Sequence, residues 1–118
     1  MKIAFVSDDG TTIHRHFGRA RQYVIVTVED GRETAREVRD KSACHGHHSD
    51  GATPDHHDSL LAVIADCQMV VSGGMGAGMD ARLRNGGITP IRTRIPAIDT
   101  AVERYISGRL TDTIELVH

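Results

Sequence analysis

The chain has 118 residues, of which 39% are hydrophobic and 3% aromatic, and its formal net charge is -2. This length suits a single domain over residues 1–118, and a core with few aromatic rings favours layered α/β packing of Val, Ile, Leu and Ala. The 14 basic residues are interspersed with 16 acidic ones, which argues against a nucleic-acid partner because such proteins concentrate their basic residues on one face.

The N-terminal residues predict a buried strand. Residues 3–6 form a continuous apolar run that ends at Asp8-Asp9-Gly10, as in a strand covered on both faces. The run is too short for the hydrophobic segment of a signal peptide or for a membrane span. We therefore expect a cytoplasmic protein with no membrane partner.

A hairpin should follow this strand. Residues 22–28 are β-branched and apolar, and Asp30-Gly31 is a dipeptide typical of tight hairpin turns. Residues 33–39 should form the second, antiparallel strand of the hairpin, and their charged side chains suit the edge of a sheet. An exposed edge strand can pair two subunits, so the sequence leaves a homo-oligomer possible.

The middle of the chain predicts a long loop and then a helix. Residues 40–55 are polar, carry two glycines and have no hydrophobic periodicity, and loops of this length are usually functional or disordered. Thr53 and Pro54 resemble the cap and the first residue of a helix that should end near Asp66.

The C-terminal half predicts two strand-and-helix units. Residues 69–71 form a short apolar strand, and a glycine-rich turn leads from it into a helix over residues 79–84. Residues 88–93 form a strand that Pro90 places near an edge. Pro96 opens the last helix, whose core-facing residues should be Ile98, Ala101, Val102, Tyr105 and Ile106.

This order of elements predicts an α/β fold with the succession βββαβαβα. It corresponds to a mixed five-stranded sheet of order 3-2-1-4-5 with helices on its faces. The first and fourth strands would then be parallel neighbours, and the loops after Val6 and Ser72 would open side by side. Ligands of open α/β sheets bind at such a position.

The loop after the first strand carries candidate cofactor-binding residues. His14 and His16 are two positions apart, so in an extended segment their side chains point the same way. Phe17 should anchor the loop in the core. Three arginines remain available for an anionic ligand: Arg15, Arg19 and Arg21. The alternative is a structural role for His16 and solvation for the arginines.

The glycine-rich turn is a second candidate binding element. Gly73, Gly74, Met75 and Gly76 enter a helix whose free amides and dipole favour an anion, and the thioether of Met75 could add a soft contact. The turn matches neither a dinucleotide fingerprint nor a phosphate loop. Its alternative role is close packing of helix on strand.

Cys67 precedes the strand over residues 69–71 and should be an inert core thiol.

The candidate metal ligands cluster in the predicted long loop. Cys44, His45, His47 and His48 place one thiol and three imidazoles within five positions, and Gly46 lets the backbone fold around one centre. Thiolate and imidazole suit Zn, Fe, Cu and cluster metals. A solvated polar loop that binds metal only adventitiously is the alternative.

With these segments in place, the chain resembles the dinitrogenase iron-molybdenum cofactor biosynthesis domain family over nearly its full length. The resemblance implies a ribonuclease H-like fold, a link to nitrogen fixation, cluster binding without catalysis, and cluster donor and acceptor proteins as partners. The family's central Cys/His loop is variable, so the four candidate metal ligands rest on their chemistry alone. The motifs that carry the resemblance are Met1-Lys2-Ile3-Ala4 with Asp8-Asp9-Gly10, His16-Phe17-Gly18-Arg19-Ala20, Ala65-Asp66-Cys67, Gly73-Gly74-Met75-Gly76, and Tyr105-Ile106-Ser107-Gly108 with Leu110.

The cysteine count limits the kind of cargo. Two cysteines cannot build a four-thiolate iron-sulfur site within one chain. A preassembled cluster that brings its own sulfides needs only one or two protein ligands and donors that neutralise its charge. We therefore expect an iron-molybdenum or another metal-sulfur cluster, with iron-sulfur and molybdenum-copper clusters both open.

The sequence leaves three functions possible. We expect the first, which is a cluster carrier or chaperone. The second is a regulatory or scaffold domain that binds a bare Zn or Fe ion and acts through a protein partner. The third is a small metal-dependent hydrolase that uses Asp8 and Asp9. The residues Ser72-Gly73-Gly74 after the second parallel strand supply no partner carboxylate, which argues against two-metal chemistry, and we expect no enzymatic activity.

Overall fold

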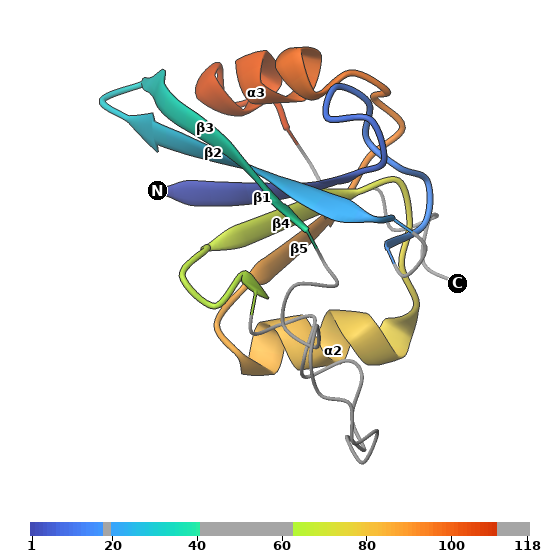
Figure 1. Cartoon of the computed structure of the whole chain (residues 1–118). Coiled ribbons are helices and arrows are strands. Elements are labelled where there is room, and N and C mark those ends of the chain that lie inside the picture. Colours follow the sequence, from blue (N-terminus) through green and yellow to red (C-terminus); the bar gives the residue numbers. More distant parts are fainter. Residues whose placement is uncertain (18–19, 41–62, 111–118) are drawn as a thin grey trace.

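The computed structural model describes residues 1–17, 20–40 and 63–110 (Figure 1). The elements of these residues form one sheet and two helices. In chain order they are β1 (Lys2–Ser7), β2 (Gln22–Glu29), β3 (Arg32–Asp40), β4 (Met69–Ser72), α2 (Ala77–Asn85), β5 (Thr89–Arg92) and α3 (Ile98–Ile106).

The five strands form a mixed sheet of order β3-β2-β1-β4-β5. The pairs β1–β2 and β2–β3 are antiparallel, and the pairs β1–β4 and β4–β5 are parallel. The predicted strand order is thus confirmed. The β2–β3 hairpin turns where predicted, at Asp30 and Gly31, which have φ angles of 54° and 75°; a tight hairpin turn requires this left-handed conformation.

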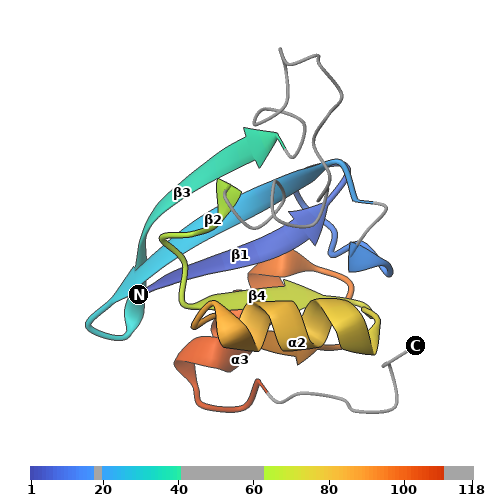
Figure 2. The ribbon, with the colours of Figure 1, turned by 90° about the horizontal axis from the view of Figure 1, so that it is seen from below.

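The two helices lie on opposite faces of the sheet (Figures 1 and 2). Successive residues of β1 point to opposite faces, so Ala4 and Val6 pack on the side of α2 while Ile3 and Phe5 pack on the side of α3. All four are fully buried. The continuous apolar run of β1 therefore reflects a strand that is covered on both faces.

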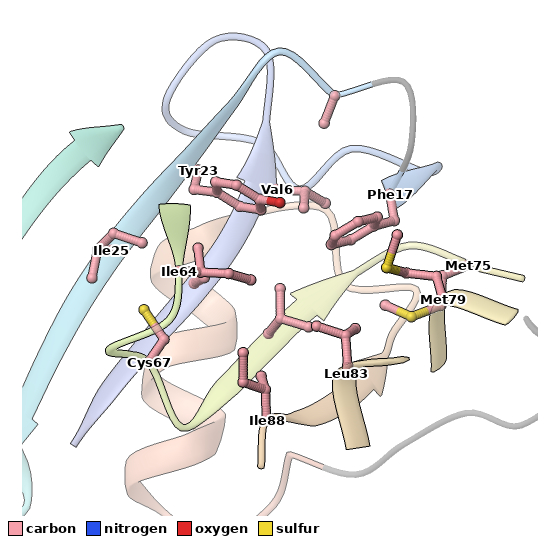
Figure 3. Close-up of a cluster of buried hydrophobic side chains, with 13 residues drawn as sticks. Val6, Phe17, Tyr23, Ile25, Ile64, Cys67, Met75, Met79, Leu83 and Ile88 are labelled. Atoms are coloured by element: carbon pink, nitrogen blue, oxygen red, sulfur yellow. The ribbon is translucent and has the colours of Figure 1, made fainter. Parts of the chain in front are cut away.

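The hydrophobic cluster beneath α2 includes the side chains of Cys67 and Met75 (Figure 3). Cys67 is 3% exposed, and its burial among apolar groups raises the pKa of its thiol to about 11. The predicted place of Cys67 in the core is thus confirmed, and a thiol with this pKa stays protonated near neutral pH.

An ion pair joins the edge strand β3 to the start of the next described segment, residues 63–110. Arg39 donates from Nη1 to Oδ1 of Asp66 over 2.6 Å and from Nη2 to Oδ2 over 2.9 Å. Its Nη1 also donates to the carbonyl of Val63 over 2.8 Å, and Lys2 contacts Asp66 over 3.0 Å. Residues 40 and 63 are thus held near each other.

The structure corrects some predicted boundaries and one core residue. Helix α2 begins at Ala77 and α3 at Ile98, two residues earlier and two later than predicted. Ile106 is 39% exposed, so its predicted place in the core is wrong. It lies about 100° around the helix axis from Tyr105, at the margin of the apolar stripe.

Some predicted elements lie outside the described residues, namely the loop over residues 40–55 beyond Asp40 and most of the helix that should end near Asp66. Among the residues that are described, we find no helix long and apolar enough to cross a membrane.

Candidate functional site

The loop after β1 is shaped by the carboxylate of Asp9. Its Oδ1 accepts hydrogen bonds from the amides of Thr11 and Thr12 over 2.9 and 2.8 Å. These two backbone hydrogen bonds hold the pKa of Asp9 well below its usual range. Asp9 therefore stabilises a turn of the loop, which directs the chain back toward the end of β4.

The loop after β1 and the glycine turn after β4 lie side by side, as predicted. The amide of Gly73 donates to the carbonyl of His14 over 2.8 Å, and the amide of Phe17 donates to the carbonyl of Gly74 over 2.9 Å. The Phe17 side chain is 2% exposed and packs in the cluster beneath α2 (Figure 3). The prediction that Phe17 anchors this loop in the core is confirmed.

Gly73 permits this close approach because it has no side chain. A Cβ added at Gly73 would lie 2.6 Å from the Cα of Arg15 and 2.9 Å from the carbonyl oxygen of His14. Both neighbours are backbone atoms, so neither can move without displacing the loop. The glycine is required here for packing of backbone against backbone.

A third segment, residues 93–96, completes the site from the end of β5. The amide of Thr93 donates to the carbonyl of Ser72 over 2.9 Å, and the amide of Ile13 donates to the carbonyl of Pro96 over 2.7 Å. The loops after β1, β4 and β5 therefore meet at the carboxyl ends of the three parallel strands, where open α/β sheets bind ligands.

These three loops enclose a cleft of about 810 Å³, which is within the usual range of ligand sites. Of the described residues that line it, Arg15 and Arg94 are the charged ones, and none is acidic. The cleft is thus suited to an anionic guest. Its lining consists of Thr12, Ile13, His14, Arg15, His16, Gly73, Thr93, Arg94, Ile95 and Pro96.

The two histidines of the loop differ in their surroundings. His14 is 22% exposed, with its Nε2 at 3.4 Å from Oδ2 of Asp8, and its Nδ1 accepts the amide hydrogen of His16 over 2.9 Å. His16 is exposed, and the two ring centroids lie 6.1 Å apart. Both residues line the cleft, although the chain bends at Arg15 between them and is not the extended segment that was predicted.

The rest of the glycine turn lies away from the cleft lining. Met75 is 2% exposed and packs in the cluster beneath α2 (Figure 3), so its thioether faces the core and not the cleft. Gly76 is the residue before α2, with an extended backbone and no side-chain cap. Gly74 uses its carbonyl to hold Phe17. Of the predicted turn residues, Gly73 lines the cleft.

The remaining predicted site residues, Arg19 and the four candidate metal ligands Cys44, His45, His47 and His48, lie outside the described residues. Within residues 1–17, 20–40 and 63–110, no group of three or more His, Cys, Asp or Glu side chains could hold a metal ion. The described cleft therefore offers imidazoles and cations, without a complete metal-ligand set.

Sequence reasoning missed the wall formed by Thr93 and Arg94. Thr93 is 6% exposed, and its Oγ1 accepts the amide of Ile95 over 3.2 Å. A signal was present in the predicted topology, because the loop after the fifth strand must open at the same edge as those after the first and fourth.

The comparisons with known proteins agree with this fold. The family described as "Dinitrogenase iron-molybdenum cofactor" matches residues 1–108. A curated protein of Methanocaldococcus jannaschii, MJ0580, whose name calls it uncharacterized, is 27% identical over 110 residues, which cover 93% of this chain and 89% of that protein.

Solved structures show the same arrangement of the chain. The crystal structure of PH0822 has a TM-score of 0.78 at 21% identity, with 98% of this chain and 99% of that chain covered. The apo form of the orange protein from Desulfovibrio gigas has a TM-score of 0.72 at 19% identity, with 95% and 92% covered. At these identities the likeness concerns the fold.

Proposed function

The chain belongs to the dinitrogenase iron-molybdenum cofactor family, and we propose that it binds and carries a preassembled, anionic metal-sulfur cluster in the cleft between the loops after β1, β4 and β5. The observation that carries this proposal is the charge of the lining, where Arg15 and Arg94 are the charged side chains and two imidazoles stand beside them. Such a lining attracts an anion and offers a nitrogen ligand to its metal.

The exposure of this site suits a carrier. His16 and Arg15 are exposed, and the described residues supply no multidentate cage. A cluster held by one or two imidazole ligands and by cations can leave when an acceptor protein offers better ligands. An iron-molybdenum cluster is the first candidate for the cargo, and iron-sulfur and molybdenum-copper clusters are the others.

The other expectations extend this proposal. We expect a single domain in the cytoplasm, no turnover of a substrate, and cluster donor and acceptor proteins as partners. We also assign the sheet to the ribonuclease H-like folds, an assignment supported by its antiparallel β3-β2-β1 half and its parallel β1-β4-β5 half.

Elemental analysis of the protein tests the proposal. The chain would be purified anaerobically without a histidine tag, and Fe, Mo, Cu, Zn and acid-labile sulfide would be measured on the same sample. Metal accompanied by sulfide in a fixed ratio to protein is the expected result. A bare metal ion without sulfide would favour the regulatory or scaffold function instead.

A double variant examines the candidate metal ligands outside the described residues. In Cys44→Ser/His47→Ala, loss of metal and sulfide together would assign part of the cluster ligation to these side chains. Unchanged loading would leave the cleft as the place where the cluster is ligated and would remove Cys44 and His47 from the proposal.

A further inference from the structure

Both ring nitrogens of the His14 imidazole lie close to other groups of the protein, Nδ1 in a hydrogen bond and Nε2 in a longer contact. Nδ1 accepts the amide hydrogen of His16 over 2.9 Å, and a nitrogen that accepts a hydrogen bond must hold a lone pair and no proton. The ring proton of the neutral imidazole is therefore on Nε2, which lies 3.4 Å from Oδ2 of Asp8. Neither nitrogen is left to bind a metal without breaking one of these contacts.

The groups around His14 are themselves held in place. Oδ1 of Asp8 accepts the amide of Arg21 over 2.8 Å. The His14 amide donates to the carbonyl of Val6 over 2.8 Å, and its carbonyl accepts the amide of Gly73 over 2.8 Å. The backbone and the ring of His14 are thus in contact with four residues: Val6, Asp8, His16 and Gly73.

The bond from His14 to the amide of His16 has the geometry of an Asx turn. Nδ1 of histidine is separated from its Cα by the same number of bonds as Oδ1 of asparagine, and in both cases the acceptor meets the amide two residues later. Such a turn bends the chain at residue 15. Arg15 and His16 consequently stand exposed at the cleft.

We infer that His14 is a positioning residue, which shapes the loop so that Arg15 and His16 meet an anionic metal-sulfur cargo and which does not itself contact the cargo metal. This inference rests on the proposed function, because it assigns roles within the same cleft. It gives the structural role to His14, whereas the alternative raised from the sequence gave such a role to His16.

Two substitutions of His14 distinguish positioning from ligation. His14→Asn removes the imidazole and keeps an acceptor for the amide of His16, whereas His14→Ala removes both. The probe is tetrathiomolybdate, a compact molybdenum-sulfide anion, and its affinity is measured by equilibrium dialysis under anaerobic conditions. We expect His14→Asn to bind within about twofold of wild type and His14→Ala to bind about fivefold or more weakly, the loss that one hydrogen bond corresponds to.

The other outcomes overturn the inference. Equal losses in His14→Asn and His14→Ala, with unchanged amide NMR shifts away from the loop, would make His14 a direct cargo contact. Unchanged affinity in both variants would leave it without a role. His16→Ala is the reference for a lost ligand and should weaken binding in either case.

A second measurement needs no cargo, so it remains decisive if wild type fails to bind the probe and the proposed function falls. Long-range ¹⁵N–¹H spectra of the imidazoles at pH 8 report which ring nitrogen carries the proton. A proton on Nε2 of His14, with the amide shift of His16 retained in His14→Asn and displaced in His14→Ala, supports the positioning role. A proton on Nδ1, or an amide shift indifferent to both variants, contradicts it.

Discussion

Gly73 and Arg15 are in such close contact that a Cβ on the glycine would lie 2.6 Å from the Cα of the arginine. This contact fixes the loop after β1 against the end of β4. It therefore determines the position of Arg15, one of the two charged residues among the described residues that line the cleft. The two residues are 58 positions apart in the sequence. The sequence pattern predicts that their loops are neighbours, but it does not predict that these two residues are in contact.

Gly73→Ala should therefore destabilise the protein and distort the cleft. We expect a loss of about 1–3 kcal/mol in the free energy of unfolding, typical of overpacking against groups that cannot move, with displaced amide shifts for His14 and Phe17. Urea unfolding and ¹⁵N–¹H spectra measure both effects. Gly78→Ala in α2 is the matched control, since nothing lies within 4 Å of its added Cβ, and it should be neutral or stabilising.

The ion pair between Asp80 and the buried Arg92 should matter more than the one between Asp80 and Arg84. Arg92 has a side chain only 3% exposed and meets Asp80 over 2.6 Å, whereas the side chain of Arg84 is 53% exposed. Asp80→Ala leaves a buried cation without this partner and should cost about 2–3 kcal/mol. Arg84→Ala should cost less than about 1 kcal/mol. Equal losses in thermal or urea unfolding would refute this ranking.

The pair between Arg39 and Asp66 predicts a pH dependence of stability. Hydrogen bonds from Arg39 lower the pKa of Asp66 below that of the unfolded chain, near 4. The stabilisation is thus fully present above about pH 4 and is lost as the pH falls toward the native pKa.

Comparison of unfolding free energies at pH 7 and pH 3 tests this dependence. Wild type should lose about 1 kcal/mol more than Asp66→Asn between these pH values, a modest figure because the Asp66 side chain is 46% exposed. Glu103→Gln, an exposed position of α3 with no ion pair among the described residues, is the control and should follow wild type. A pH profile shared by all three proteins would contradict the prediction.

Cys67 should resist thiol reagents in the native protein. Its thiol is 3% exposed with a pKa raised to about 11, so at pH 8 roughly one molecule in a thousand carries the reactive thiolate. In a Cys44→Ser background, where Cys67 is the one remaining cysteine, iodoacetamide should label the chain in urea and leave the native state unmodified. Rapid labelling of the native state would show that this part of the core opens.

The strand pattern of the sequence was sufficient to predict the sheet. The apolar run at residues 3–6, the turn at Asp30-Gly31 and the proline at residue 90 each reflect a local physical requirement, and together they leave few topologies. Helix ends were predicted less well, because the N-cap residues, Gly76 before α2 and Ala97 before α3, make no side-chain capping hydrogen bond and so do not mark a boundary.

The site was predictable in part. The two histidines and the glycine turn were found because chemically distinctive residues follow predicted parallel strands. Arg94 was missed, since a single arginine after a strand looks like any surface residue, although the predicted strand order already brought its loop to the same edge of the sheet as that of Arg15. The inward direction of Met75 was equally hidden, because it depends on how the turn meets the core beneath α2.

The most direct test of the proposed function is the metal and sulfide content of an Arg15→Ala/His16→Ala double variant, isolated anaerobically and without a histidine tag, beside wild type and an Arg104→Ala control on the exposed side of α3. We predict that wild type and Arg104→Ala contain metal and sulfide in the same ratio to protein, and that the double variant, folded by its ¹⁵N–¹H spectrum, loses both. Full loading of the double variant would contradict binding of the cluster in the cleft.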